Sequence, residues 1–176
     1  GGLWRMKWRL PIIMSAVLMV GFCMGIGLKW IYETNTFRPY EWRSTPIIMN
    51  CYGEDFSELQ MTRAIGYWTL RGHQVDSYVH NPPREVCETE GMIDGTILLK
   101  RARWWELEAP TLANTQRMTS GFKIVAAVIT YRAGAHNLNL LNEHELGHAL
   151  GYGHIDEDGH IMHPIYGKMT EKFWIP

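Results

Sequence analysis

One stretch of the sequence is the most informative about the fold and about the metal ion that the chain can bind: His144-Glu145-Leu146-Gly147-His148-Ala149-Leu150-Gly151-Tyr152-Gly153-His154. On a helix, His144 and His148 leave the same face one turn apart. Gly151 can adopt the positive φ that ends a helix, so the chain can turn and bring His154 back to the same point. Three neutral imidazole nitrogens and a water complete the tetrahedral coordination of a catalytic zinc ion. The spacing therefore predicts a single Zn²⁺ with His144, His148 and His154 as its ligands.

Glu145 follows His144 directly, so its carboxylate borders the position that the histidines leave open at the metal. Zinc lowers the pKa of a bound water towards neutrality, and a neighbouring carboxylate can accept the proton of that water. The pattern predicts a hydrolase in which Glu145 is the general base. Two other interpretations stay open: Glu145 can orient a histidine instead, or the domain can be a zinc-stabilised binding or structural module that lacks catalysis.

These residues, with a methionine 8 positions after His154, resemble the signature of the metzincin metallopeptidases. Met162 corresponds to the methionine turn of that family. Within it the chain is most similar to the matrixins, because Pro164 and Tyr166 match the x-Pro-x-Tyr stretch that follows their methionine. Astacins and serralysins are less similar, since they place a zinc-binding tyrosine where this chain has Pro164. The resemblance covers residues 46–170, and its specific motifs lie near the end of that range.

The resemblance implies a zinc-dependent endopeptidase that cleaves proteins or peptides. It also implies that Leu140, Pro164 and Tyr166 shape the pocket for the side chain after the cut bond. Residues 111–115 resemble the edge strand of bacterial matrixin-like proteins, where an extended substrate can pair through its main chain. The chain departs from the family at Ile155, where matrixins usually have serine, and it lacks the His/Asp-rich loop that binds structural zinc and calcium.

Four other residues can carry chemistry outside the motif. His160 and His163 lie close to it, and either can contact substrate, although solvated loop histidines are the simpler interpretation. Cys51 and Cys87 are the cysteines outside the apolar N-terminal stretch. In an exported domain such a pair predicts a disulfide, with two free thiols as the alternative.

The order of the expected elements is strand, helix, strands, helix, which is typical of a mixed α/β layered domain. Strands are predicted at residues 46–52, 74–80, 96–101 and 124–131, the last apolar throughout and therefore covered on both faces. Asp55 with Glu58 predicts the start of a helix that runs to about Arg71, before Gly72. A second helix, residues 138–150, carries the zinc ligands. This order agrees with the metzincin catalytic domain, a twisted mixed sheet packed on the zinc-binding helix.

Residues 10–28 form 19 positions without a charge, about 28 Å as a helix against about 30 Å of bilayer core. Basic residues precede this stretch and tryptophans flank it, namely Arg5, Lys7, Arg9, Trp4, Trp8 and Trp30. The pattern predicts a transmembrane signal-anchor within residues 1–29 with a cytoplasmic N-terminus, a linker at 30–45 and an exported catalytic domain at 46–176. A cleaved signal peptide is the alternative, because Gly25-Ile26-Gly27 offers small residues at a cleavage position.

Charge and polarity disfavour two other classes of protein. Without residues 1–29, 13 basic residues face 18 acidic ones, a net charge of −5 that predicts no nucleic-acid partner. The basic and aromatic cluster at residues 100–105 is short and is typical of a solvated strand end. An intramembrane protease also uses H-E-x-x-H, but here the motif follows Asn137, Asn139 and Asn142, which a spanning helix would bury at high cost. The predicted partners are therefore a protein or peptide substrate and a membrane.

Overall fold

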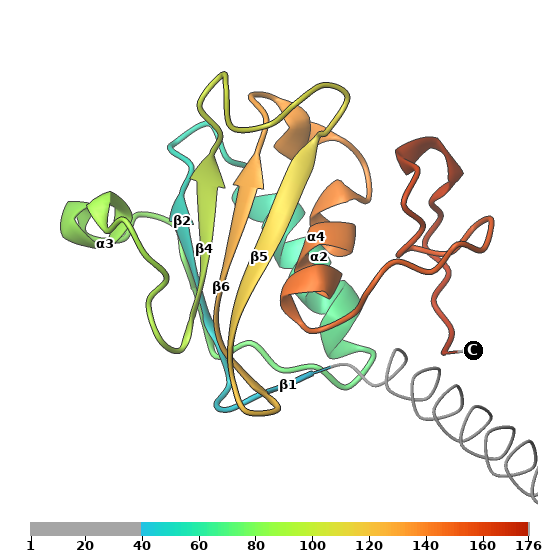
Figure 1. The fold of residues 1–176 in the computed structure, drawn as a ribbon, viewed down its shortest axis with the longest axis horizontal. Helices are drawn as coiled ribbons and strands as arrows, with labels where there is room; N and C mark the ends of the chain where they lie inside the picture. The colour runs from blue at the N-terminus through green and yellow to red at the C-terminus, as the bar shows by residue number, and fades with distance from the viewer. Residues whose placement is uncertain (1–39, 176) are drawn as a thin grey trace, which may run out of the picture. The chain divides into compact units, whose positions relative to one another are not determined.

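A six-stranded sheet with helices packed against it forms the domain, which the computed structural model describes for residues 40–175 (Figure 1). Its strands are β1 (Glu41–Trp42), β2 (Ile47–Cys51), β3 (Ser77–Val79), β4 (Thr96–Arg101), β5 (Ala113–Ser120) and β6 (Lys123–Tyr131). The α-helices are α2 (Glu58–Thr69), α3 (Arg84–Glu88) and α4 (Leu141–Ala149), and short 3-10 helices lie at Ala135–Asn137 and Tyr166–Lys168. The predicted anchor, residues 10–28, lies outside the described residues. Among residues 40–175, no helix is long and apolar enough to cross a bilayer.

The sheet is mostly parallel, with one antiparallel strand at its edge (Figure 1). β2 pairs in parallel with β3 and β4, and β4 pairs in parallel with β6. β5 runs antiparallel to β6 and has no second partner among the described strands. One side of β5 therefore keeps main-chain N–H and C=O groups that can pair with another extended chain.

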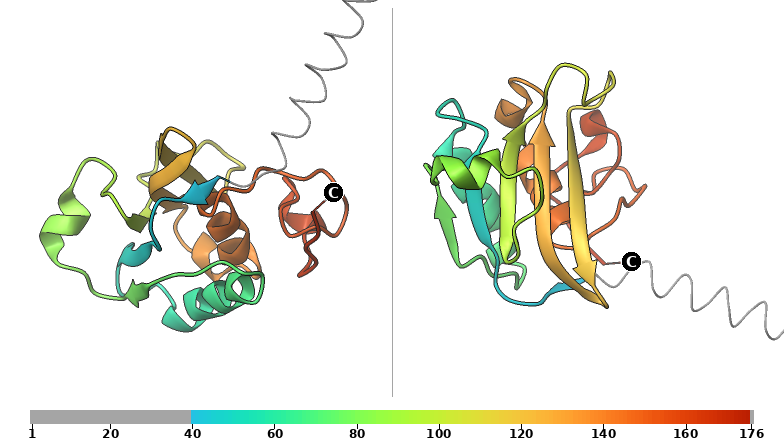
Figure 2. Two further views of the ribbon diagram at one scale, coloured as in Figure 1. Left: turned by 90° about the horizontal axis from the view of Figure 1, so that it is seen from below. Right: turned by 60° about the vertical axis from the view of Figure 1, so that its left-hand side comes forward.

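The core lies between the sheet and helices α2 and α4, which cover the same face (Figure 2). Ile97 and Leu99 of β4 belong to one buried cluster with Trp68 of α2 and Leu146 of α4. Side chains alternate along a strand, so Leu98 points to the opposite face, yet it is also 0% exposed. The middle of the sheet is thus covered on both faces, which explains the uninterrupted apolar sequence of its central strands.

Helix α2 begins later than the sequence pattern predicts. Ser57, rather than Asp55, is its N-cap, and the Ser57 hydroxyl oxygen accepts a hydrogen bond from the Gln60 backbone N–H at 3.4 Å. Phe56 is only 1% exposed and packs in the core, so the chain completes a turn before the helix begins. The Ser57 and Gln60 pair has the spacing of a capping box, as does the Asp55 and Glu58 pair two positions earlier.

Part of the predicted linker belongs to the domain. Glu41 and Trp42 form β1, which pairs in parallel with the start of β6. The Trp42 indole N–H donates a hydrogen bond to the Ala149 carbonyl oxygen at 3.0 Å, at the end of α4. Two residues are too few to show a strand periodicity, which is why the sequence of residues 30–45 indicates only a linker.

Cys51 and Cys87 form a disulfide that ties α3 to the end of β2, with their Cα atoms 5.2 Å apart and 36 residues apart in sequence. Closing a loop of this length restricts the unfolded chain and stabilises the fold by roughly 2–4 kcal/mol. We expect replacement of both cysteines by serine to lower the free energy of unfolding by that amount in urea titrations. After reduction, the parent and the variant should unfold alike. Equal unfolding midpoints under oxidising conditions would contradict a stabilising role.

Candidate metal centre

Helix α4 and the turn after it bring the three histidines of the motif to one point. His144 and His148 lie one turn apart on α4, and Gly151 follows the helix with a φ of 116°. A side chain is excluded at Gly151, because a Cβ there would lie 2.4 Å from the Tyr40 carbonyl oxygen. The chain then returns, so that the His148 Nε2 atom lies 3.0 Å from His144 Nε2 and 3.1 Å from His154 Nε2.

The hydrogen bonds of His144 and His148 leave the Nε2 atom of each ring free to bind a metal ion. His144 Nδ1 lies 2.8 Å from the Ile161 carbonyl oxygen, and His148 Nδ1 lies 2.9 Å from the Tyr152 carbonyl oxygen. A carbonyl only accepts hydrogen bonds, so each Nδ1 carries the proton and each Nε2 presents a lone pair. Facing lone pairs repel unless a cation lies between them. Zn–N bonds of about 2.0–2.1 Å in a tetrahedron place nitrogens about 3.3 Å apart, close to the spacing here, so the donor set fits zinc.

Burial keeps these histidines uncharged. It lowers the pKa of His144 to about 4 and that of His148 to about 3. Burial also lowers the pKa of His154, although its side chain is more exposed. All three rings are therefore neutral at physiological pH, as ligands of a metal must be.

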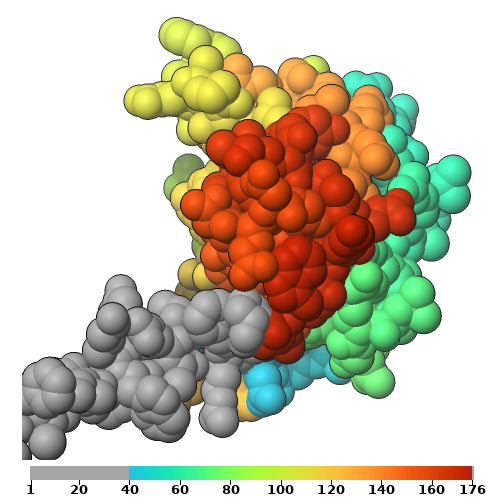
Figure 3. Space-filling model, turned by 90° about the vertical axis from the view of Figure 1, so that its right-hand side faces the viewer, coloured from blue at the N-terminus to red at the C-terminus, as the bar shows by residue number. Residues whose placement is uncertain are grey.

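The Met162 side chain packs against helix α4 at Gly147, between the ligands His144 and His148 in the sequence. It is 0% exposed, and a Cβ on Gly147 would come within 2.5 Å of its sulfur and within 2.5 Å of the Trp68 ring. Only glycine at position 147 lets both side chains pack this closely against the helix. The Met162 carbonyl oxygen accepts a hydrogen bond from the Ile155 N–H at 3.0 Å, next to His154. This bond holds Met162 close to the third ligand, and the chain after α4, orange to red in Figure 3, lies on one face of the domain.

Glu145 lies beside the histidines and is 5% exposed. Burial raises the pKa of its carboxyl group to about 7, an effect that a hydrogen bond from Thr115 opposes. The Thr115 hydroxyl, on β5, donates this bond to Glu145 Oε2 at 2.6 Å. The zinc motif does not predict that Thr115 contacts Glu145. The sequence offers one indication: Thr115 lies on the edge strand two positions after Ala113, so both side chains point to the face towards α4.

A mostly apolar hollow of about 620 Å³ opens beside the ligands. The start of β5, the start of α4 and the segment after the methionine line it, with side chains that include Leu112, Leu141, Pro164, Tyr166, His144 and Glu145. The structure therefore brings two of the predicted pocket residues, Pro164 and Tyr166, next to the metal site. A hollow of this size is typical of a ligand pocket.

Leu140, the third predicted pocket residue, does not line this hollow. It precedes α4 with a φ of 66° and is 8% exposed, in a recess that Gln60 and Arg63 of α2 also line. This left-handed conformation delays the start of the helix from residue 138 to Leu141. Leu141 is consequently the leucine that faces the hollow.

His160 and His163 are not solvated loop residues, because both are 0% exposed. His160 Nδ1 accepts a hydrogen bond from the Met162 N–H at 2.9 Å, and His163 Nδ1 accepts one from the Ile165 N–H at 2.9 Å. The two rings therefore stabilise the turn around Met162. His163 also lines the hollow, whereas neither ring belongs to the cluster of ligand nitrogens among the described residues.

Comparison with known proteins agrees with this geometry. A family model described as Matrixin, a peptidase family, matches residues 65–176. The match spans more than half of the 176 residues and includes α4, His154 and Met162. A search of curated proteins finds no match for the chain.

Proposed function

Because the chain belongs to the matrixin family and carries a zinc metallopeptidase domain, we propose that it is an exported, membrane-anchored endopeptidase that hydrolyses proteins or peptides. The observation that carries this proposal is the convergence of three histidine nitrogens beside buried Glu145 at the wall of an apolar hollow. A zinc-stabilised module without catalysis would need the histidines but neither the carboxylate nor the hollow.

The chemistry follows from the placement of these groups. His144, His148 and His154 would hold zinc through Nε2, and the ion would supply a Lewis acid that lowers the pKa of water. The Glu145 carboxylate accepts the proton of the water that attacks the peptide carbonyl, and later donates it to the amine nitrogen of the broken C–N bond. Burial raises the pKa of this carboxyl group, so it has a higher affinity for a proton than a solvated glutamate has, which favours its role as the proton acceptor.

The edge strand provides a binding surface for the substrate. β5 offers free main-chain groups along one side, and main-chain hydrogen bonds hold an extended peptide with little dependence on its sequence. Ala113, where β5 begins, lines the hollow together with Glu145. A peptide paired with β5 therefore passes the general base and places one side chain in the hollow.

Mass spectrometry of cleavage products from a proteome-derived peptide library tests the proposal. We expect cuts inside peptides by the full chain loaded with zinc, and none after chelation. Trimming from peptide ends alone, or cleavage that survives chelation, would contradict the proposed activity.

The lining of the hollow predicts cleavage before Leu, Ile, Met or Phe. An apolar wall cannot solvate a charge, so peptides with Asp or Lys at this position should not be cleaved. Each methylene group that fits contributes only about 0.8 kcal/mol, so the preference among apolar side chains should change gradually with their size. Leu141→Ala should deepen the hollow and shift the cleavage profile towards Phe and Trp. Leu140→Ala, a matched truncation outside the hollow, should leave the profile unchanged. A shift in both variants, or a preference for charged side chains, would overturn this pocket.

Membrane attachment is supported by the sequence of residues 10–28, with its length, basic flank and tryptophans. The positive charges before this stretch favour a cytoplasmic N-terminus and a catalytic domain on the other side. The disulfide between Cys51 and Cys87 is typical of an oxidising compartment and supports export. Carbonate extraction of cell membranes checks the anchor: release of the full chain into the soluble fraction would contradict it.

A further inference from the structure

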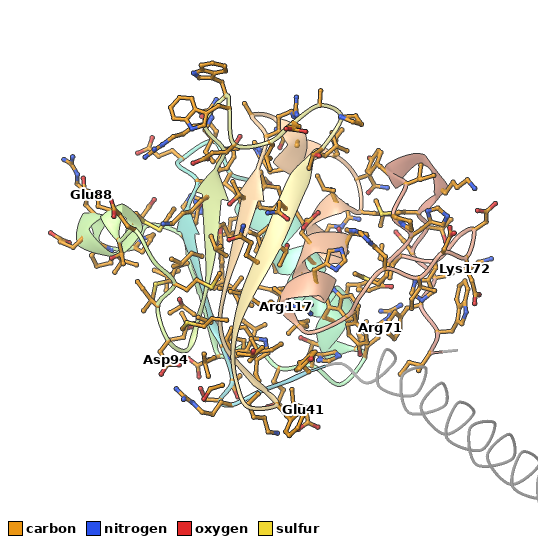
Figure 4. The ribbon with its side chains drawn as sticks, in the orientation of Figure 1. Glu41, Arg71, Glu88, Asp94, Arg117 and Lys172 are labelled. Atoms are coloured by element: carbon orange, nitrogen blue, oxygen red, sulfur yellow. A yellow bond between two sulfur atoms is a disulfide. The ribbon has the colours of Figure 1, made fainter. Side chains whose placement is uncertain are left out.

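Strand β5 contacts the metal-binding helix through two polar side chains on one face. Side chains alternate along a strand, so Thr115 and Arg117 point the same way, towards α4. The Thr115 hydroxyl donates to Glu145 Oε2, and the Arg117 guanidinium donates to the His148 carbonyl oxygen at 2.9 Å. Figure 4 shows Arg117 beside α4. The strand that is proposed to bind substrate is therefore also bonded to the general base.

We propose that Thr115 is a positioning residue for Glu145, whose hydroxyl holds one carboxylate oxygen against β5 and leaves the other to accept the proton. The inference deepens the proposed function and rests on it. Glu145 lines the hollow, and its Oε1 atom is the carboxylate oxygen that Thr115 does not bind. Within residues 40–175, the Glu145 carboxylate makes no other hydrogen bond.

The physical reason is that a buried carboxylate needs a fixed donor. At 5% exposure, Glu145 has little water to satisfy it, and its side chain can rotate about three bonds. A hydroxyl-to-carboxylate bond of 2.6 Å is short and charge-assisted, so it selects one orientation. Misplacing a reacting group by about 1 Å can lower a rate by about 10²-fold. The hydroxyl thus acts on the rate through the geometry of Glu145.

Removing this hydroxyl should leave the strand in place. Thr115 lies opposite Ile129 in the β5–β6 pairing, and the main chain forms that ladder. The bond from Arg117 to His148 also holds β5 against α4 without Thr115. Valine has nearly the shape of threonine and favours a strand equally. Thr115→Val therefore removes only the hydroxyl, which lies 2.6 Å from Glu145 Oε2 and, at a longer distance of 3.3 Å, from the Glu145 backbone carbonyl oxygen.

The test compares Thr115→Val, Thr115→Ser and Thr130→Val in the full chain, using a peptide that the zinc-loaded parent cleaves. Thr130 lies on β6, between β4 and β5 and away from the substrate-binding edge, and its hydroxyl has no hydrogen bond in the described structure, so Thr130→Val is the matched control. We expect Thr115→Val to lower kcat by about 10–100-fold, the usual effect of losing a supporting hydrogen bond at a metal site, and to leave KM, zinc content and thermal unfolding unchanged. Thr115→Ser, which keeps the hydroxyl, should retain parental kcat.

Three outcomes would overturn the proposal: parental kcat in Thr115→Val, equal losses in Thr115→Val and Thr115→Ser, or a loss of zinc or stability in Thr115→Val that accounts for its lower rate. Crystal structures of the parent and Thr115→Val add a readout that does not depend on turnover. The Glu145 carboxylate should be displaced or split between orientations in the variant, and an unmoved carboxylate counts against positioning. A parent that cleaves no peptide would end the proposed function, while this structural comparison would still test the contact.

Discussion

Glu145→Gln is expected to fold, to keep zinc and to lose nearly all turnover, with kcat lowered by about 10²–10⁴-fold. The amide preserves the shape of the side chain and can still accept the hydrogen bond that Thr115 donates to Oε2 at 2.6 Å. It cannot accept the proton of the attacking water. Steady-state kinetics on a library-derived peptide, together with metal analysis of the same samples, measures both parts of this result.

Glu143→Gln is the matched control for that experiment. Glu143 lies on the same helix and is equally 5% exposed, but its carboxylate faces Arg63 of α2 at 3.8 Å. Both substitutions replace a buried carboxylate by an amide, so a general effect of lost charge would appear in both. Activity of Glu145→Gln within about tenfold of the parent, only about 1.4 kcal/mol of barrier, would remove Glu145 from the role of general base.

His154→Ala should release zinc without unfolding the domain. His154 is the most exposed of the three ligands, so its removal leaves the core intact. Structural zinc sites with four protein ligands bind the ion with about 10–16 kcal/mol, so each ligand contributes roughly 3 kcal/mol. The loss of His154 should therefore weaken zinc affinity by about 10²-fold or more. Competition with a fluorescent chelator measures the affinity, and thermal unfolding of the zinc-free proteins checks the fold.

His80→Ala serves as the control, because His80 follows β3 at the opposite edge of the sheet from β5. Its zinc affinity should equal that of the parent. Parental affinity in His154→Ala would mean that another group is the third ligand. His160 and His163 would be the first to examine, although a change of ligand would disturb the hydrogen bonds that their Nδ1 atoms accept in the turn around Met162.

The sequence by itself determined the elements whose pattern is local. The predicted strand at residues 96–101 matches β4, Thr96–Arg101, and the apolar run 124–131 matches β6 to within one residue. The spacing of the metal ligands is equally local, since His144 and His148 lie one turn apart on any helix. These features depend on neighbouring residues alone, so periodicity and spacing reveal them.

Boundaries and pocket residues were decided by packing. The core position of Phe56 moves the start of α2 to the residue after Ser57, and the left-handed Leu140 moves the start of α4 to Leu141. That second shift changes which leucine faces the hollow. The local pattern offers both Asp55 and Ser57 as the cap of α2, and contacts with other elements select between such alternatives.

Contacts between distant residues belong to the tertiary structure alone. Thr115 meets Glu145 across 30 residues, and Trp42 meets Ala149 across 107. Gly147 lies inside the zinc motif, yet the need for glycine there comes from Trp68 and from the sulfur of Met162, which pack where a Cβ would lie. The motif supplies the ligands and the base, whereas close packing of elements far apart in sequence decides how the base is held and what surrounds the metal.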